Sequence, residues 1–120
     1  MSMAKILVVD DAEFLRVRLT KMLDVDGYEV FQAENGLKAV ALYKEIHPDV
    51  VLMDVTMPEM DGLTALKEIV SFDAKARVIM LTALGQESVV LEAVKSGARD
   101  FIVKPFEHER VSKAITKLLA

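Results

Sequence analysis

The chain has 120 residues, a length that fits one domain with a hydrophobic core of its own. Hydrophobic residues make up 52% and charged residues 28%, which excludes a disordered chain. The net charge of −4 argues against direct nucleic-acid binding. The lack of cysteine excludes thiolate chemistry, and no apolar run reaches the roughly 18 residues of a membrane span. We therefore expect one soluble, cytoplasmic domain over residues 1–120, without membrane insertion.

Short apolar segments alternate with segments of helical period along the chain. In chain order, we predict strand 5–10 and helix 13–26, strand 28–33 and helix 36–46, strand 49–54 and helix 62–72, strand 77–82 and helix 86–97, and strand 100–103 and helix 107–119. This alternation predicts an α/β fold, a doubly wound five-stranded parallel sheet with five helices. The strands lack alternation of polar and apolar residues, as expected when helices cover both faces of a sheet.

Four polar residues follow or end four of the predicted strands. Asp10, Asp54, Thr82 and Lys104 stand where the apolar runs 6–9, 50–53, 78–81 and 101–103 stop. The carboxyl ends of parallel strands share one edge of the sheet, and ligands bind at that edge in open α/β folds. We therefore expect these side chains to converge on one pocket.

Three carboxylates in this pocket predict a divalent cation. Asp11 follows Asp10, and together with Asp54 they supply the hard oxygen ligands that Mg²⁺ prefers. The alternatives are that Asp11 caps the following helix and that Asp54 is an ordinary strand-end residue. Carboxylates crowded together repel one another, and a bound cation removes that repulsion, which Lys104 alone offsets only in part.

Two loops beside the pocket carry further signals. The Lys104–Pro105 bond could be cis, which would turn Lys104 inward, although a trans bond is the default for X-Pro. The loop 55–61 is longer than most connections between a strand and a helix, and Asp61 is a candidate cap for the helix that follows.

An ordered set of motifs along the whole chain resembles the receiver domain of two-component response regulators, with the single-domain chemotaxis (CheY-like) regulators as the most similar type. The motifs are Val9-Asp10-Asp11, Met53-Asp54, Met57-Pro58, Asp61-Gly62, Leu81-Thr82-Ala83, Gly97-Ala98 and Lys104-Pro105-Phe106. The resemblance implies a flavodoxin-like fold with strand order 2-1-3-4-5. It also implies a phosphorylation-dependent signalling switch rather than an enzyme. The chemistry of such a switch is limited to self-phosphorylation and autodephosphorylation.

The resemblance assigns roles to individual residues. Asp54 would accept a phosphoryl group from a phosphohistidine, and Mg²⁺ would be held by Asp10, Asp11, Asp54 and the backbone carbonyl of Thr56. Lys104 would pair with one phosphoryl oxygen and the Thr82 hydroxyl with another. Phe101 matches the switch aromatic that turns inward as Thr82 moves; the alternative is a phenylalanine of the strand core.

The partners implied are a sensor histidine kinase, a downstream target on the face formed by the fourth helix, fifth strand and last helix, and a possible phosphatase. The protein is expected to be a monomer that binds no nucleic acid directly. One alternative is the receiver part of a multidomain transcriptional regulator. An aspartyl-phosphate phosphatase is disfavoured because Asp54-Val55-Thr56 lacks a second Asp as general acid, and an FMN binder because the turn Asp11-Ala12-Glu13 is acidic.

Overall fold

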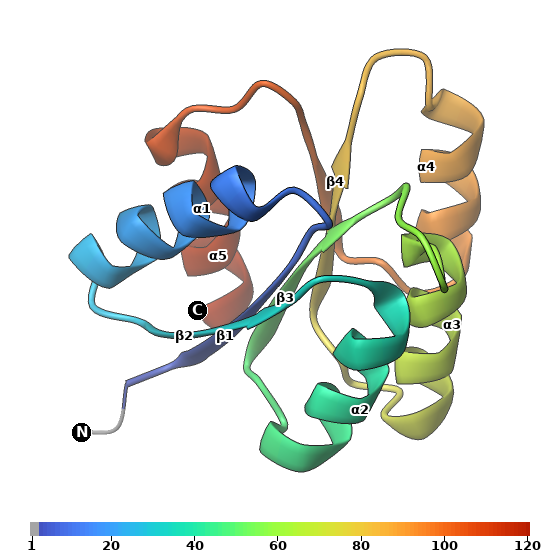
Figure 1. Cartoon of the computed structure of the whole chain (residues 1–120), viewed down its shortest axis with the longest axis horizontal. Helices are drawn as coiled ribbons and strands as arrows, with labels where there is room; N and C mark the ends of the chain where they lie inside the picture. Colours follow the sequence, from blue (N-terminus) through green and yellow to red (C-terminus); the bar gives the residue numbers. More distant parts are fainter. Residues whose placement is uncertain (1–2) are drawn as a thin grey trace.

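The computed structural model describes residues 3–120, which form five strands and five helices in strict alternation (Figure 1). The strands are β1 (Lys5–Val9), β2 (Glu29–Ala33), β3 (Val50–Asp54), β4 (Val78–Thr82) and β5 (Asp100–Val103). The helices are α1 (Glu13–Val25), α2 (Gly36–Ile46), α3 (Gly62–Phe72), α4 (Glu87–Lys95) and α5 (His108–Leu119). Each predicted element is present, and most of its boundaries lie within one or two residues of the predicted ones.

All five strands are parallel and lie in the order β2-β1-β3-β4-β5, which confirms the doubly wound, flavodoxin-like sheet. β1 and β3 are neighbours at the centre, and Val9 of β1 pairs in register with Met53 of β3. β4 lies on the other side of β3, and Thr82 at its end pairs with Val103 of β5. The carboxyl ends of β1, β3, β4 and β5 therefore lie along one edge.

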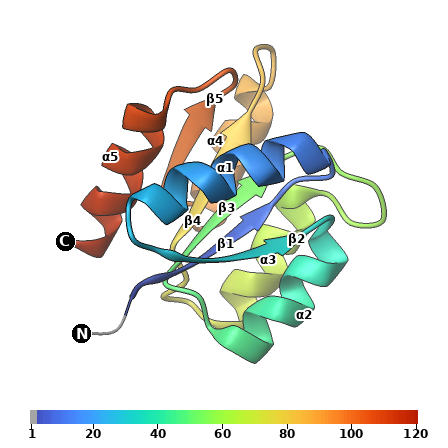
Figure 2. The ribbon, with the colours of Figure 1, turned by 60° about the vertical axis from the view of Figure 1, so that its left-hand side comes forward.

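Helices cover both faces of the sheet, with α1 and α5 on one face and α2, α3 and α4 on the other (Figures 1 and 2). Alternate strand residues point to opposite faces, so that Ile6 and Val8 join the core under α1 and α5 while Leu7 and Val9 join the other. Nearly all side chains of the three central strands β1, β3 and β4 are completely buried, which explains why these strands are apolar over most of their length.

The largest boundary difference concerns α4, which spans Glu87–Lys95 instead of the predicted 86–97. Gln86 precedes the helix and its side chain is turned away from it, towards the preceding loop. Gly97 has a φ of +113°, a left-handed conformation that ends the helix.

No helix within residues 3–120 is long and apolar enough to cross a membrane.

Candidate phosphoacceptor and cation site

Three carboxylates meet at the carboxyl ends of the two central strands. Asp10 directly follows β1 and Asp54 ends β3, and the pairing of Val9 with Met53 places the two side by side. Each of Asp10, Asp11 and Asp54 offers an oxygen atom, and these three atoms lie within 4.8 Å of one another. Asp10 and Asp54 are buried, with 1% and 7% of their surface exposed, whereas Asp11 is exposed. The cluster thus opens to solvent on the side of Asp11.

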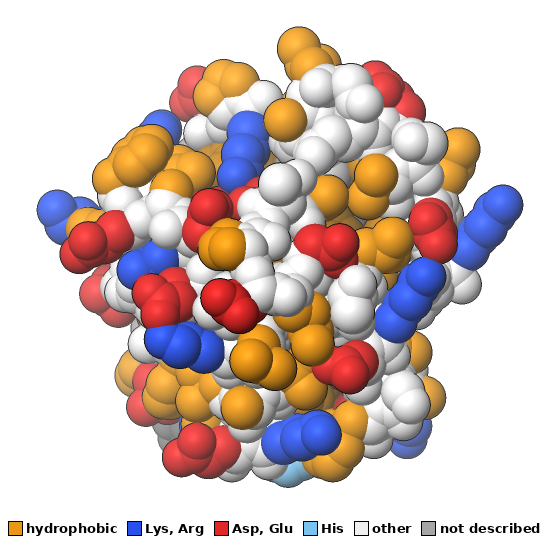
Figure 3. All heavy atoms as spheres, turned by 45° about the vertical axis from the view of Figure 1, so that its right-hand side comes forward, with side chains coloured by type: hydrophobic (Ala, Val, Ile, Leu, Met, Phe, Trp, Pro, Cys, Tyr) orange, Lys and Arg blue, Asp and Glu red, His pale blue; other side chains and the backbone are white. Residues whose placement is uncertain are grey.

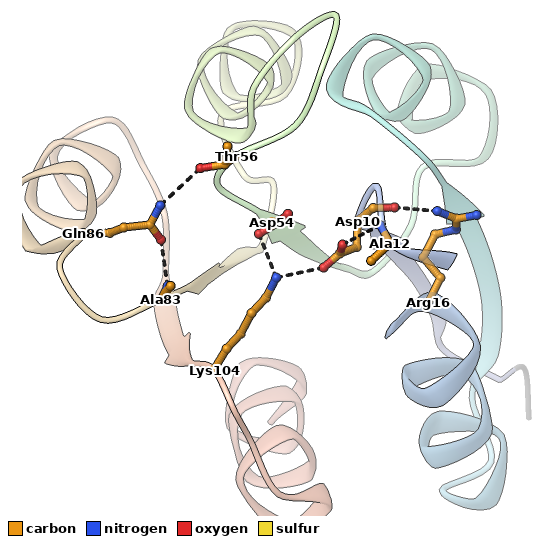
Figure 4. A network of polar contacts seen from close by, with 8 residues as sticks. All are labelled: Asp10, Ala12, Arg16, Asp54, Thr56, Ala83, Gln86 and Lys104. Carbon is orange, nitrogen blue, oxygen red and sulfur yellow. Dashed lines mark hydrogen bonds and ion pairs between the residues drawn. The ribbon is translucent and has the colours of Figure 1, made fainter. Parts of the chain in front are cut away.

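Hydrogen bonds to the α1 segment hold Asp10 in place (Figure 4). Its Oδ1 accepts the backbone N–H of Ala12 at 2.9 Å, and its backbone carbonyl accepts Nη1 of Arg16 at 2.7 Å. The residue that caps α1 is Ala12, without a side-chain hydrogen bond. The alternative that Asp11 caps this helix is therefore wrong: the neighbouring Asp10 holds the turn, which leaves the Asp11 carboxylate at the open side of the cluster.

Lys104 reaches the cluster from the segment after β5. Its Nζ lies 3.0 Å from Oδ2 of Asp10 and 3.0 Å from Oδ1 of Asp54 (Figure 4). Its backbone N–H donates to the carbonyl of Thr82 at 2.6 Å, which fixes the two strand ends to each other. The Lys104–Pro105 peptide bond is cis, which confirms the candidate cis bond named from the sequence.

Burial shifts the pKa values of Asp54 and Lys104, and the hydrogen bonds of Lys104 to the carboxylates oppose both shifts. Burial raises the pKa of Asp54, the charges of Asp10 and Asp11 add to this, and the hydrogen bond from Lys104 opposes it without cancelling it. Burial lowers the pKa of Lys104, but its hydrogen bonds to Asp54 and Asp10 outweigh burial and leave its pKa raised. Lys104 therefore holds its proton more tightly than a free lysine does, and Asp54 beside it is harder to ionise than a free aspartate.

The loop after β3 is positioned by a glycine that approaches the strand closely. A Cβ atom at Gly62 would lie 1.9 Å from the backbone oxygen of Asp54, so no other residue fits there. Asp61, just before it, accepts the backbone N–H of Thr64 at 2.8 Å and caps α3. Helix α3 therefore begins directly against the strand end that carries Asp54.

Thr82 and Phe101 line an apolar groove beside the carboxylate cluster. The groove has a volume of about 370 Å³ and lies between the ends of β4 and β5 and helix α4. Thr82 is buried, whereas Phe101 is 40% exposed. The alternative that Phe101 belongs to the strand core is therefore wrong, because β5 is an edge strand in which Ile102 faces the core and its neighbours do not.

The donor set fits a magnesium ion. Three carboxylate oxygens close together are hard ligands that carry more negative charge than the single ammonium of Lys104 neutralises.

On the face of the molecule shown in Figure 3, Lys and Arg side chains are scattered among Asp and Glu rather than gathered into a basic patch.

Two residues at this site were missed by the sequence analysis. Arg16 holds the Asp10 carbonyl, and Gln86 links Ala83 to Thr56 through its side-chain amide (Figure 4). Gln86 stands in the run Ala83-Leu84-Gly85-Gln86, which contributes to the resemblance to chemotaxis regulators, but that run assigned it no role in the site. For Arg16 the available signal was an arginine in the first turns of the helix that follows the acidic pair.

The fold and the acidic cluster define a class, the phosphorylation-dependent receiver domains, and comparison with known proteins agrees. The family model described as "Response regulator receiver domain" matches residues 6–116, so the chain belongs to the response regulator receiver family. The chain acts in two-component signalling as a switch rather than as a classical enzyme.

Individual relatives indicate the chemotaxis type. The chain is 57% identical to the chemotaxis protein CheY of Bacillus subtilis over 116 residues, which cover 96% of this chain and 97% of that protein. A receiver domain protein from Clostridium thermocellum superposes with a TM-score of 0.94 at 32% identity, covering 98% of this chain and 94% of that one. CheY in the CheX–CheY–BeF3–Mg complex of Borrelia burgdorferi superposes with a TM-score of 0.92 at 38% identity, covering 98% and 90%.

Proposed function

We propose that Asp54 accepts one phosphoryl group from a phosphohistidine of a sensor histidine kinase, and that Mg²⁺ is held by Asp10, Asp11, Asp54 and the backbone carbonyl of Thr56. The observation that carries this proposal is the cluster itself: three carboxylates within 4.8 Å and an ammonium 3.0 Å from Asp54. A bound magnesium ion would neutralise charge on the carboxylates and on the incoming phosphoryl oxygens.

In the reaction, an oxygen of Asp54 forms a bond to phosphorus while the bond from phosphorus to the histidine nitrogen breaks. The nitrogen keeps the electron pair, and the product is an acyl phosphate on Asp54. Lys104, already beside Asp54, pairs with a phosphoryl oxygen, and the buried Thr82 hydroxyl donates to another. Hydrolysis of the acyl phosphate by water returns Asp54 to its carboxylate and completes one signalling cycle.

Phosphorylation from a small donor tests this proposal. Incubation with acetyl phosphate and Mg²⁺ should add one phosphoryl group per chain, measured by intact mass, and EDTA should prevent the addition. Asp54→Ala should remain unmodified, and Asp49→Ala, in the turn before β3, is the matched control that should be modified normally. Equal modification of wild type and Asp54→Ala would contradict the assignment.

We further propose that the signal is read on the face formed by α4, β5 and α5. A phosphoryl group adds a charge of roughly −1.5 to −2 next to Thr82 and shifts the population of conformers at Phe101. Phe101 is partly exposed in the apolar groove, as a switch residue requires before it turns inward. Leu84, Leu91 and Val103 leave further apolar surface around this groove, which suits a protein partner.

The switch is tested by beryllofluoride, a phosphoryl mimic, on the isotope-labelled protein. With Mg²⁺, it should shift the backbone amide resonances of α4, β5 and α5 in wild type, and Thr82→Ala should lose most of these shifts while still binding the mimic. Shifts confined to the cluster in wild type would contradict the proposed output face.

We propose that residues 1–120 act as one receiver domain and as a monomer. Sedimentation with and without beryllofluoride tests whether the protein is a monomer.

A further inference from the structure

The side chain of Gln86 joins the loops that follow the two strands β3 and β4. Its Oε1 accepts the backbone N–H of Ala83 at 2.7 Å, and its Nε2 donates to Oγ1 of Thr56 at 3.2 Å (Figure 4). Thr56 lies two residues after Asp54, and Ala83 directly follows Thr82. One amide group therefore connects the segment after the proposed phosphoacceptor to the segment that carries the proposed switch hydroxyl.

The local backbone turns Gln86 towards this position. Gln86 precedes α4, where a polar side chain ordinarily accepts hydrogen bonds from the first N–H groups of the helix, but it makes no such bond. The preceding Gly85 has a φ of +92°, a conformation that side-chain-bearing residues rarely adopt, and this turn directs the Gln86 side chain back along the loop. The Gln86 amide thus forms the bridge and does not cap α4.

Apart from the partly buried Val89, which packs against the core, few contacts restrain this end of α4. Ala93 is the one fully buried residue of the helix, and it lies near the opposite end. The remaining polar link across to α3 is the exposed ion pair between Lys67 and Glu92, with 2.9 Å between Nζ and Oε1. Exposed ion pairs of this kind contribute little to stability. The Gln86 bridge is therefore well placed to control how the loop after Thr82 moves.

We propose, on the basis of the phosphorylation of Asp54 proposed above, that Gln86 is a positioning residue that holds the Thr82–Ala83 segment against Thr56 while Asp54 is unmodified. When Asp54 carries a phosphoryl group, Thr82 shifts towards it, Ala83 moves with Thr82, and the bridge opens. An interaction made in only one of two states favours that state by its own free energy. Gln86 therefore opposes activation, and removing its amide makes activation easier.

The substitution Gln86→Met tests this, because methionine has similar length and makes neither hydrogen bond. Its affinity for beryllofluoride in saturating Mg²⁺, titrated by amide resonances, should be about three- to tenfold higher than that of wild type, the effect expected for one or two partly exposed hydrogen bonds. Thr56→Val, which removes the other partner, should act in the same direction. Because both substitutions break the same bridge, the double variant should bind no more tightly than Gln86→Met alone.

Lys67→Met is the control for a general loosening of α4, since it removes the ion pair to Glu92 without touching the bridge. It should leave the affinity for beryllofluoride unchanged. An equal gain in Lys67→Met, or an affinity of Gln86→Met equal to or below that of wild type, would overturn the proposal.

The bridge is also tested without any ligand. The Ala83 amide proton should exchange with solvent at least about fivefold faster in Gln86→Met than in wild type, because it loses its acceptor. Equal exchange would show that the bridge does not form in solution, which overturns this inference and leaves the function of Asp54 untouched. Wild-type protein that fails to bind beryllofluoride, by contrast, would overturn the phosphoacceptor assignment and the role of the bridge with it.

Discussion

The ammonium of Lys104 lies 3.0 Å from Oδ1 of Asp54, although 50 residues separate them in the chain. The same nitrogen is equally close to Asp10, so that one lysine is the counter-ion of two buried carboxylates. A cation that binds Asp10 and Asp54 must therefore share these carboxylates with Lys104. Because Lys104 is also the residue proposed to pair with the phosphoryl group, cation binding and phosphoryl binding affect the same side chain.

Replacement of Lys104 by methionine should separate these two roles. Without the ammonium, Asp10 and Asp54 lose their counter-ion, and the free energy of unfolding in EDTA should fall by about 2–3 kcal/mol, the contribution of hydrogen bonds to charged groups. Binding of Mg²⁺ should become several-fold tighter, because the competing positive charge is gone. Urea denaturation in EDTA and at a series of Mg²⁺ concentrations measures both effects. Unchanged stability in EDTA would show that the ion pairs contribute nothing.

Asp11 offers the complementary test, because it is exposed and its charge adds to the repulsion at Asp54. Asp11→Asn should raise the melting temperature in EDTA by about 2 °C, the shift expected when a few tenths of a kcal/mol of repulsion are removed. It should also weaken Mg²⁺ binding by at least about tenfold, since a ligand is lost. A variant that is less stable in EDTA yet binds Mg²⁺ normally would contradict both the repulsion and the ligand assignment.

The raised pKa of Asp54 predicts a pH dependence of stability. In EDTA the folded state holds the Asp54 proton more tightly than the unfolded state does, where the pKa of this carboxyl is 3.8. The free energy of unfolding should therefore receive a contribution from Asp54 that falls as the pH rises from that value through the folded pKa. Other carboxylates titrate too, so the quantity to measure is the difference between wild type and Asp54→Asn across this range. A difference that is flat with pH would contradict a raised pKa.

Much of the site was predictable because it depends on a simple pattern. An apolar run that ends in a polar residue marks the carboxyl end of a buried strand, and parallel pairing brings such ends together. Asp10, Asp54 and Lys104 lie close together for this reason, and the acidic cluster could be predicted from the sequence alone.

The features that escaped prediction depend on local geometry or on strand position. The bridge of Gln86 arises from a left-handed turn at Gly85 and from the path of a second loop, neither of which leaves a pattern in the sequence. The exposure of Phe101 follows from the edge position of β5, which the apolar run 101–103 does not reveal. The strand order itself came from the resemblance, because the handedness of the connections permits several orders.

The close approach of Gly62 to Asp54 yields the last prediction. A Cβ atom at Gly62 would lie 1.9 Å from the Asp54 backbone oxygen, which belongs to a fully buried strand and cannot yield as a flexible side chain would. Gly62→Ala should therefore lower the free energy of unfolding by about 3 kcal/mol or more. Because the displaced atoms carry Asp54, phosphorylation by acetyl phosphate should also slow markedly in the fraction that remains folded.

Gly27→Ala is the matched control for this steric argument. Its Cβ would meet nothing within 4 Å, and only its φ of +89° disfavours alanine. It should cost about 1 kcal/mol and leave phosphorylation unchanged. Thermal denaturation and intact mass on both variants decide the matter: similar losses of stability and normal phosphorylation in both would contradict the steric argument. The expected contrast would instead show that Gly62 is glycine because α3 must begin in contact with the strand that presents Asp54.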